Sequence, residues 1–192
     1  AGAALVVAIP GWWQAVGLNM PPGWRSLHLL ILPAVIVFAP LLAGIKPMES
    51  STFWVLVLGY ALTGLAEETM FRGVMLKVLE RHPVVMAVIV SSLLFGLVHL
   101  TNIVIRGNPA IIFAQAFGAF TFGVGYAALR LRLNTIWPLI VLHMLHDLVL
   151  QVGTLPLIPV DVAQDVVLVS YGAWLLWHMR GRTVADLLPE RA

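Results

Sequence analysis

Residues 66–73 read Ala-Glu-Glu-Thr-Met-Phe-Arg-Gly, and this charged stretch lies inside a long apolar segment. Residues 53–65, directly before it, carry no charged side chain at all. Glu68 and Arg72 are four residues apart, so on a helix they share a face and can pair. Charged groups inside hydrocarbon are costly, and they therefore turn toward the interior of a helix bundle and toward one another. The stretch predicts a membrane helix with a polar inner face.

The composition of the chain points to lipid as its solvent. Of its 192 residues, 60% are hydrophobic and only 10% are charged, and its mean hydropathy is +0.96. Soluble domains carry about 25% charged residues, and one small core cannot bury so much apolar surface. The absence of cysteine excludes disulfides and thiolate metal sites. No basic run with interleaved aromatic residues suggests nucleic-acid binding, so we expect membrane lipid as a partner and no nucleic acid.

The distribution of charge predicts an all-α, polytopic membrane bundle with a polar cavity inside the bilayer. A bilayer-spanning helix needs about 20 apolar residues. Six segments approach this length, some only with their flanks: 26–45, 50–66 (continuing as helix to about Glu80), 82–105, 107–129, 133–160 and 166–179, the last starting as early as Val162. We interpret "GTLPLIPVDVAQD" as the loop between the last two spans.

The domain boundaries follow from the same pattern. Residues 1–25 are expected to form an apolar, interfacial segment, as the tail of an earlier helix. Residues 26–182 form the membrane domain, with the motifs concentrated in 55–150, and residues 183–192 form a cytoplasmic tail. Basic residues in cytoplasmic loops set orientation. With the Lys77 end inside, eight basic residues fall in the cytoplasm and only two outside: Lys46 and Arg106.

Away from the span ends, seven ionisable residues remain inside the predicted spans, and their spacing favours one shared site. They are Glu67, Glu68, Arg72, His99, His143, His146 and Asp147. His143 and Asp147 are four residues apart on one helix face. From a rise of about 1.5 Å per residue, the acids and histidines of three helices come to similar depths. His146, for which hydrogen bonding to backbone is the simpler interpretation, is a supporting residue.

Three motifs in order resemble those of the CPBP family of intramembrane proteases. "EETMFRG" fits EExxxR, "FGLVH" fits FxxxH and "HMLHD" fits HxxxN/D. The family includes the Rce1-type CAAX prenyl proteases and bacterial relatives tied to bacteriocin processing and self-immunity. The resemblance covers residues 55–150 and implies an all-α bundle around a conical polar cavity. It also implies a catalytic Glu67 or Glu68 with His99, His143 and Asp147, while Arg72 completes the first motif. Asp147 stands where many members have Asn, and an ionised Asp cannot donate a hydrogen bond to an oxyanion.

Peptide hydrolysis needs an activated water and a stabilised oxyanion. We assign the base to Glu67, with Glu68 the close alternative, because Glu68 is spaced to pair with Arg72. His99 is expected to position the water or a metal, and His143 to polarise the carbonyl. His99, His143 and Glu67 also form a set that can hold zinc or another divalent metal. A metal-free glutamate–water mechanism uses the same residues and stays open. Ser91 and Ser92 lie outside the motifs and are poor candidates for a nucleophile.

The sequence therefore predicts an intramembrane endopeptidase that is CAAX-protease-like and is a metalloprotease if a metal is bound. Its substrate is a peptide or lipidated protein, and its location is the bacterial cytoplasmic membrane. Two alternatives remain. Buried Glu, His and Asp on facing helices also build proton- or ion-coupled transporters, although no inverted repeat is visible. A non-catalytic membrane scaffold is the second alternative.

Overall fold

The chain forms helices and connecting turns in the part that the computed structural model describes, residues 12–20 and 24–188, with only the backbone of 105 and 106. The helices are α2 Trp12–Ala15, η1 Trp24–Leu30, α3 Ile31–Phe38, η2 Ala39–Ala43, α4 Ser50–Glu67, η3 Glu68–Met75, α5 Leu76–Val78, α6 Val84–His99, η4 Leu100–Asn102, α7 Ile103–Arg106, α8 Pro109–Leu133, α9 Trp137–Val152 and α10 Leu157–Met179. This confirms the all-α bundle. Among the described residues, three helical segments are long and apolar enough to cross a bilayer: Ser26–Ala43, Val84–Asn102 and Pro109–Leu133. The chain is an integral membrane protein.

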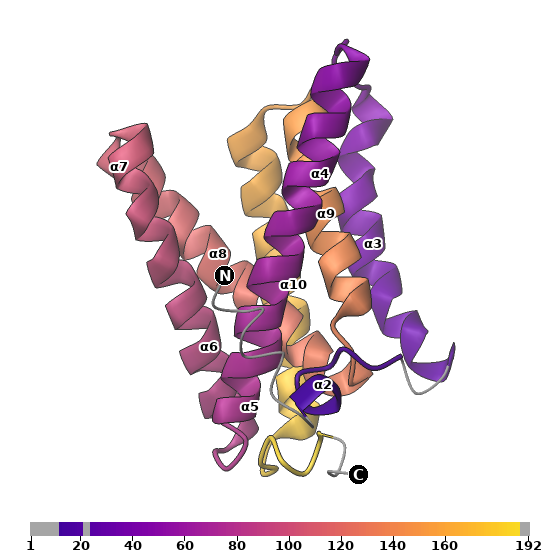
Figure 1. The fold of residues 1–192 in the computed structure, drawn as a ribbon, viewed down its shortest axis with the longest axis vertical. Helices are drawn as coiled ribbons and strands as arrows, with labels where there is room; N and C mark the ends of the chain where they lie inside the picture. Colours follow the sequence, from indigo (N-terminus) through magenta and orange to yellow (C-terminus); the bar gives the residue numbers. More distant parts are fainter. Residues whose placement is uncertain (1–11, 21–23, 189–192) are drawn as a thin grey trace.

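The bundle has two groups of helices, α6, α8 and α10 in one and α4, α9 and α3 in the other (Figure 1). α8 packs against α6 on one side and against α10 on the other, while α4 packs against α9 and α9 against α3. Small residues allow these close approaches. A Cβ added to Gly172 of α10 would lie 2.8 Å from the Cα of Gly125 of α8, and one added to Gly123 would lie 2.9 Å from the Cβ of Ser92. The Gly- and Ala-rich stretch in α8 thus packs two helices.

The predicted fifth and sixth spans have wrong boundaries. We expected one span over 133–160 and a loop up to residue 165, but α9 ends at Val152 and α10 begins at Leu157. Pro159 lies in the first turn of α10, where its missing N–H removes no helical hydrogen bond. Most of the predicted loop is therefore the first two turns of a helix, which brings Asp161 and Asp165 into the bundle.

The charged motif lies on a π-helix, which the sequence did not predict. α4 continues without a break into η3, whose hydrogen bonds are those of a π-helix, and then into α5. π-turns widen a helix and occur mostly as short interruptions at functional sites. The carbonyl oxygen of Phe71 within η3 accepts a hydrogen bond of 2.7 Å from the Ser91 hydroxyl of α6. This bond ties the π-helix to a neighbouring helix.

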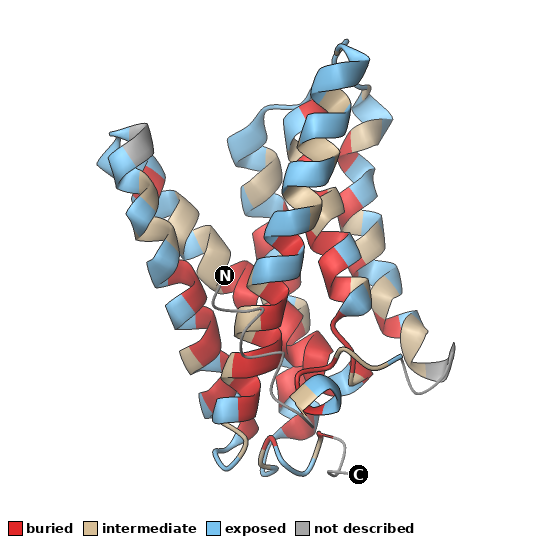
Figure 2. Ribbon diagram, viewed as in Figure 1, coloured by how far each residue is buried: buried red, intermediate tan, exposed pale blue. Residues whose placement is uncertain are grey.

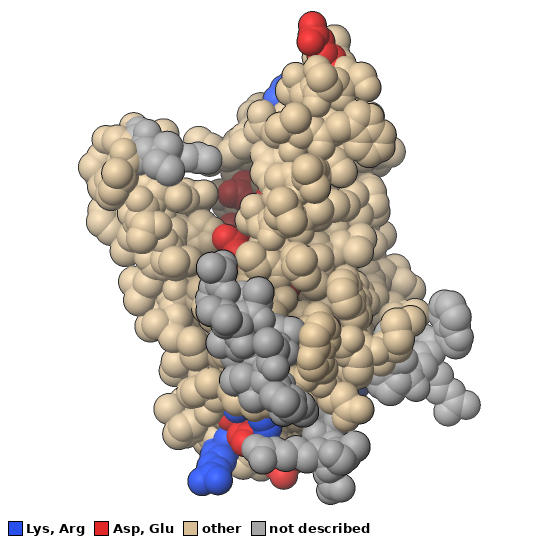
Figure 3. All heavy atoms as spheres, in the orientation of Figure 1, with Lys and Arg blue, Asp and Glu red and all other residues tan. Residues whose placement is uncertain are grey.

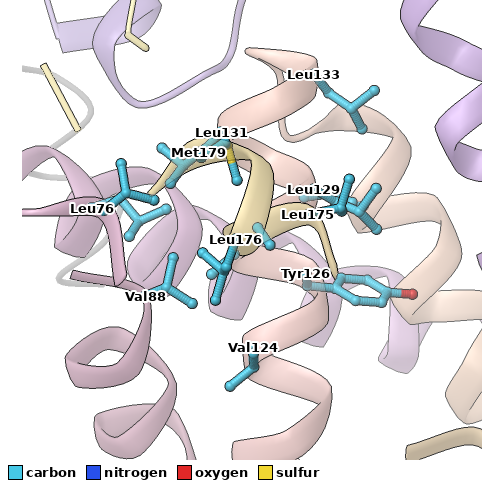
Figure 4. Packing of buried hydrophobic residues seen from close by; sticks show 14 of the residues in the cluster. Leu76, Val88, Val124, Tyr126, Leu129, Leu131, Leu133, Leu175, Leu176 and Met179 are labelled. Carbon is cyan, nitrogen blue, oxygen red and sulfur yellow. The ribbon is translucent and has the colours of Figure 1, made fainter. Parts of the chain in front are cut away.

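Buried residues gather in one half of the bundle, around the end that carries α5 (Figure 2). Figure 4 shows this core, where Leu76 of α5, Tyr126 and Leu129 of α8 and Leu175 of α10 pack together, each no more than 2% exposed. Large apolar side chains lie exposed on the outer faces of the helices, as lipid contact requires: Trp54, Leu58, Leu62, Leu93, Leu97, Phe113, Phe117, Trp174 and Trp177.

Both flanking segments pack on the α5 end of the bundle. Within the predicted N-terminal segment, residues 1–11 and 21–23 lie outside the described residues, but Val16 is fully buried and Ala15 accepts a 3.1 Å hydrogen bond from Arg130. We expected Arg130 among the cytoplasmic charges, yet it is fully buried at the end of α8. In the predicted tail, Val184 is buried and its N–H donates to the carbonyl oxygen of His82.

Candidate active site

Glu68, Arg72 and His143 form the buried centre of the candidate site. The Glu68 carboxylate is completely buried, and its Oε1 lies 3.1 Å from Arg72 Nη1 and 2.7 Å from His143 Nδ1. A carboxylate held by arginine can only accept, so His143 donates through Nδ1–H. In its neutral form the His143 ring therefore has its lone pair on Nε2, and in its charged form it donates from both nitrogens. Glu68 fixes the orientation of this imidazole, as a carboxylate behind a functional histidine does.

Glu67 and Asp147 lie on the other side of the same imidazole. His143 Nε2 is 3.6 Å from Glu67 Oε2 and 3.9 Å from Asp147 Oδ2. The side chains of Glu67 and Asp147 keep 26% and 27% of their surface exposed, whereas Glu68 has none. The two adjacent glutamates thus differ: one is locked behind the histidine, and the other stands at an accessible face with no arginine on it.

His99 enters the site from α6, at the end of that helix. Its Nδ1 lies 2.8 Å from the carbonyl oxygen of Phe95 one turn earlier. Because a carbonyl oxygen only accepts, Nδ1 carries the proton and Nε2 has a free lone pair. Glu67 interacts electrostatically with both His99 and His143. The structure thus brings all five predicted catalytic residues, together with Arg72, around one region of α4–η3, α6 and α9.

Aromatic rings separate and support these polar groups. Phe95 lies against His99 with ring centroids 4.8 Å apart, and the Arg72 guanidinium is 4.2 Å from the centre of the Phe95 ring. From α8, Phe122 stacks on Tyr126 at 3.9 Å and reaches His143 at 5.0 Å. The sequence motifs include Phe95 but gave no signal for Phe122 or Tyr126, because the predicted span over 107–129 has no charged residue.

Sequence reasoning also missed a second polar cluster, formed by His146, Asp161 and Asp165. His146 Nε2 lies 3.6 Å from Asp161 Oδ1, and His146 Nδ1 is buried without a hydrogen-bond partner. The expected backbone hydrogen bond of His146 is therefore not formed. Asp165 is buried, one turn after Asp161 on α10. The i,i+4 spacing of the two aspartates was a usable signal, but the assumption of a loop hid it.

A hollow opens beside these groups, on the side of the molecule away from α5. Figure 3 shows it between the α6–α7 arm and the α4 column, with acidic atoms on its walls and no basic atoms of the described residues visible within it. The bundle therefore has a polar recess at the level of the candidate site.

A divalent metal held by His99, His143 and Glu67 stays a prediction. Across residues 12–20 and 24–188, no group of three His, Cys, Asp or Glu side chains is placed to hold a metal ion. Glu68 is held by Arg72 and by the His143 N–H, so its Oε1 is already used. We therefore route no chemical step through a metal.

The two serines in α6 have structural roles. Ser91 donates its hydroxyl proton to Phe71 of the π-helix, and Ser92 donates to the Val88 carbonyl within its own helix at 2.7 Å. Neither serine hydroxyl has a histidine partner among its hydrogen bonds. Ser91 and Ser92 therefore do not form the Ser–His pair that activates a serine nucleophile.

The fold and the site define an all-helical integral membrane protein with a carboxylate–imidazole centre buried between its helices. A family model described as type II CAAX prenyl endopeptidase Rce1-like matches residues 49–149. The match covers more than half of the chain, and the chain belongs to this Rce1-like family. No curated protein and no solved structure matches the chain. The family points to a peptidase that acts on a peptide substrate in the membrane.

Proposed function

We propose that the chain is an intramembrane endopeptidase in which Glu67 activates water for attack on a peptide carbonyl. The observation that carries this proposal is the placement of His143 between two carboxylates. Glu68 holds the Nδ1 side of the ring through a 2.7 Å hydrogen bond, while Glu67 faces the Nε2 side at 3.6 Å. Glu68 is committed to structure and Glu67 is available for chemistry.

The reaction begins when the Glu67 carboxylate takes a proton from water and the water oxygen bonds to the carbonyl carbon. The His99 Nε2 lone pair accepts a hydrogen bond from the second water O–H and so orients the water, and this hydrogen stays on the attacking oxygen. Protonated His143 donates its Nε2–H to the developing oxyanion. The carbon–nitrogen bond then breaks, and the proton on Glu67 passes to the leaving amine. The products are a carboxylic acid and an amine.

Asp147 is assigned to support the charged form of His143. It lies 3.9 Å from Nε2, so an ionised Asp147 favours a positive imidazole. This role explains how an aspartate can stand where many relatives have asparagine. The aspartate acts through the histidine rather than by donating to the oxyanion itself.

The proposal is tested by comparing membrane peptides from cells that carry the wild-type chain with those from cells that carry Glu67→Gln. A peptidase leaves products that depend on Glu67, and purified protein in nanodiscs then cleaves the corresponding peptides. If no peptide depends on Glu67 while the variant changes ion flux across vesicles, the transporter alternative is correct. If neither changes, the chain is a scaffold.

Metal dependence has its own test. Because the proposed steps use only Glu67, His99 and His143, cleavage should persist after exhaustive dialysis against a chelator, with less than about one metal ion per ten chains by elemental analysis. If cleavage disappears and returns on addition of zinc, the His99–His143–Glu67 metal mechanism replaces the one written here.

A further inference from the structure

We propose that His146, Asp161 and Asp165 form a subsite that binds an organic cation, an ammonium or guanidinium group carried by the peptide substrate. The proposal rests on the proposed peptidase function, and it names a substrate feature that the catalytic residues do not select. Both aspartates lie outside the three sequence motifs, on α10, while His146 lies within the third motif on α9.

Neither aspartate is paired with a lysine or arginine among the described residues. Asp161 and Asp165 are four residues apart on α10, so both carboxylates lie on one helix face. None of the ion pairs formed within residues 12–20 and 24–188 joins either aspartate to a lysine or arginine, whereas Glu68 is paired with Arg72. A pair of carboxylates between membrane helices without a cation is costly, and a cationic ligand offsets that cost.

The histidine provides the second, independent observation. His146 is 6% exposed and makes no hydrogen bond. Its Nδ1 is buried without a partner, and its Nε2 faces Asp161 Oδ1 from 3.6 Å, which is too far for a hydrogen bond. A buried imidazole that faces a carboxylate without a hydrogen bond to it is rare in folded proteins. A donor group that reaches His146 Nε2 and Asp161 Oδ1 together would give both of these atoms a hydrogen-bond partner.

The facing helix leaves room for the carboxylates. Gly118 of α8 lies opposite Asp165, and a Cβ at position 118 would come within 2.7 Å of Asp165 Oδ2. The Thr121 hydroxyl donates to the Gly118 carbonyl oxygen at 2.8 Å and also lies within hydrogen-bond reach of the Asp165 carboxyl group, so Thr121 is one wall of the subsite. Since no three His, Cys, Asp or Glu side chains in the described chain are placed to hold a metal, the cluster suits an organic cation better than a metal ion.

The position of the cluster sets where the cation lies on the substrate. The Phe122 ring is 5.0 Å from His143 and 5.1 Å from His146, so the two imidazoles are at most about 10 Å apart. An extended peptide rises about 3.3 Å per residue. A lysine or arginine within about four residues of the scissile bond therefore reaches Asp161 while its carbonyl lies at His143.

The test measures binding and cleavage separately, in nanodiscs, with short apolar peptides whose termini are blocked. One peptide carries a central lysine, the second has norleucine there, and a third has norleucine and a free N-terminal amine. Binding is measured on the Glu67→Gln chain, which needs no turnover. The lysine peptide should bind at least about tenfold more tightly than its norleucine counterpart, the effect of one charge-assisted hydrogen bond. A gain for the third peptide instead identifies the N-terminal amine as the cation.

Substitutions at the two aspartates test whether the preference for the lysine peptide arises at this cluster. Asp161→Asn and Asp165→Asn, each added to the Glu67→Gln chain, should bring the ratio of the affinities for the lysine and norleucine peptides to about one. Asp161→Glu keeps the charge and should keep the preference for the lysine peptide. Glu49→Gln is the matched control, because it removes an exposed carboxylate at the N-cap of α4 and should leave the preference intact. Asp161 is partly exposed, so this position remains testable if Asp165→Asn does not fold.

The outcomes separate this inference from the proposed function. Lysine-dependent binding that needs Asp161, in a chain that cleaves none of the peptides, supports the cation subsite and contradicts the peptidase. Cleavage and binding without preference for a cationic peptide, or a preference that Asp161→Asn leaves unchanged, overturns the subsite and leaves the peptidase standing.

Discussion

At the scale of single residues, the two adjacent glutamates have different surroundings and so different tasks. Glu68 is fully buried and shares its Oε1 between Arg72 and His143, while Glu67 keeps a quarter of its side chain exposed and faces His143 Nε2. In a regular α-helix, side chains one residue apart point about 100° apart. Here both reach one imidazole, but from opposite sides of the ring.

Asp147 gives a prediction at this scale. Asp147→Asn keeps the side-chain shape but removes the charge 3.9 Å from His143 Nε2. Since the charge favours the protonated imidazole, we expect a lower pH optimum and roughly tenfold slower cleavage at neutral pH. Measuring cleavage rate against pH for wild type and variant tests this role. An unchanged pH profile contradicts it, and a rate maximum displaced to lower pH supports it.

How far sequence reasoning reached is clearest at these residues. The motif spacings placed Glu67, Glu68, His99, His143 and Asp147 on three helices, and the structure brings them together because each lies on the inner face of its helix. Phe122 and Tyr126 were not foreseen, since aromatic residues in an apolar helix carry no signal of which ring faces a polar site. Asp161 and Asp165 were missed because residues 153–165 were interpreted as a loop between two spans, whereas α10 begins at Leu157.

At the scale of elements, the π-helix η3 is the feature that local sequence does not reveal. It depends on tertiary partners: Ser91 binds the Phe71 carbonyl, and the N-terminal segment covers Gly73. A Cβ at position 73 would lie 2.9 Å from the Val16 carbonyl oxygen, so glycine is needed for this contact. Arg130 holds the same segment through Ala15. The residues before the membrane domain therefore support the helix that carries the catalytic motif.

This contact predicts the effect of Gly73→Ala. The added methyl group meets backbone, so we expect a loss of about 1–3 kcal/mol in stability, together with slower cleavage as η3 shifts. Gly59→Ala is the matched control in the preceding helix, where a Cβ meets nothing within 4 Å. Thermal unfolding in detergent compares the two variants. Equal stabilities would mean that the N-terminal segment does not fix the π-helix.

At the scale of the whole molecule, the recess and the basic end lie at opposite ends of the bundle. Figure 3 shows the hollow in the half away from α5, and basic atoms at the α5 end. The predicted orientation places the α5 end in the cytoplasm. The hollow then opens toward the other face of the membrane, and a peptide reaches the site from that face or from the lipid.

The chain contains no cysteine, so its orientation can be measured without first removing any. Ser50→Cys lies at the start of α4 and Ala185→Cys beyond the end of α10, and both positions are exposed. In intact cells, a membrane-impermeant maleimide should label Ser50→Cys at once and Ala185→Cys only after lysis. The reverse pattern would place the hollow on the cytoplasmic side and contradict the charge-based orientation.

The central claim, that Glu67 is the base and Glu68 its structural neighbour, is tested most directly by single-turnover cleavage with Glu67→Gln and Glu68→Gln side by side. Glu67→Gln should fold with wild-type stability and cleave about 10³-fold more slowly, since its base is gone. Glu68→Gln leaves Arg72 buried without its anion, so we expect a stability loss of about 3–5 kcal/mol together with its activity loss. If Glu67→Gln cleaves at the wild-type rate while a stable Glu68→Gln does not cleave, the two roles are reversed and the mechanism proposed here is wrong.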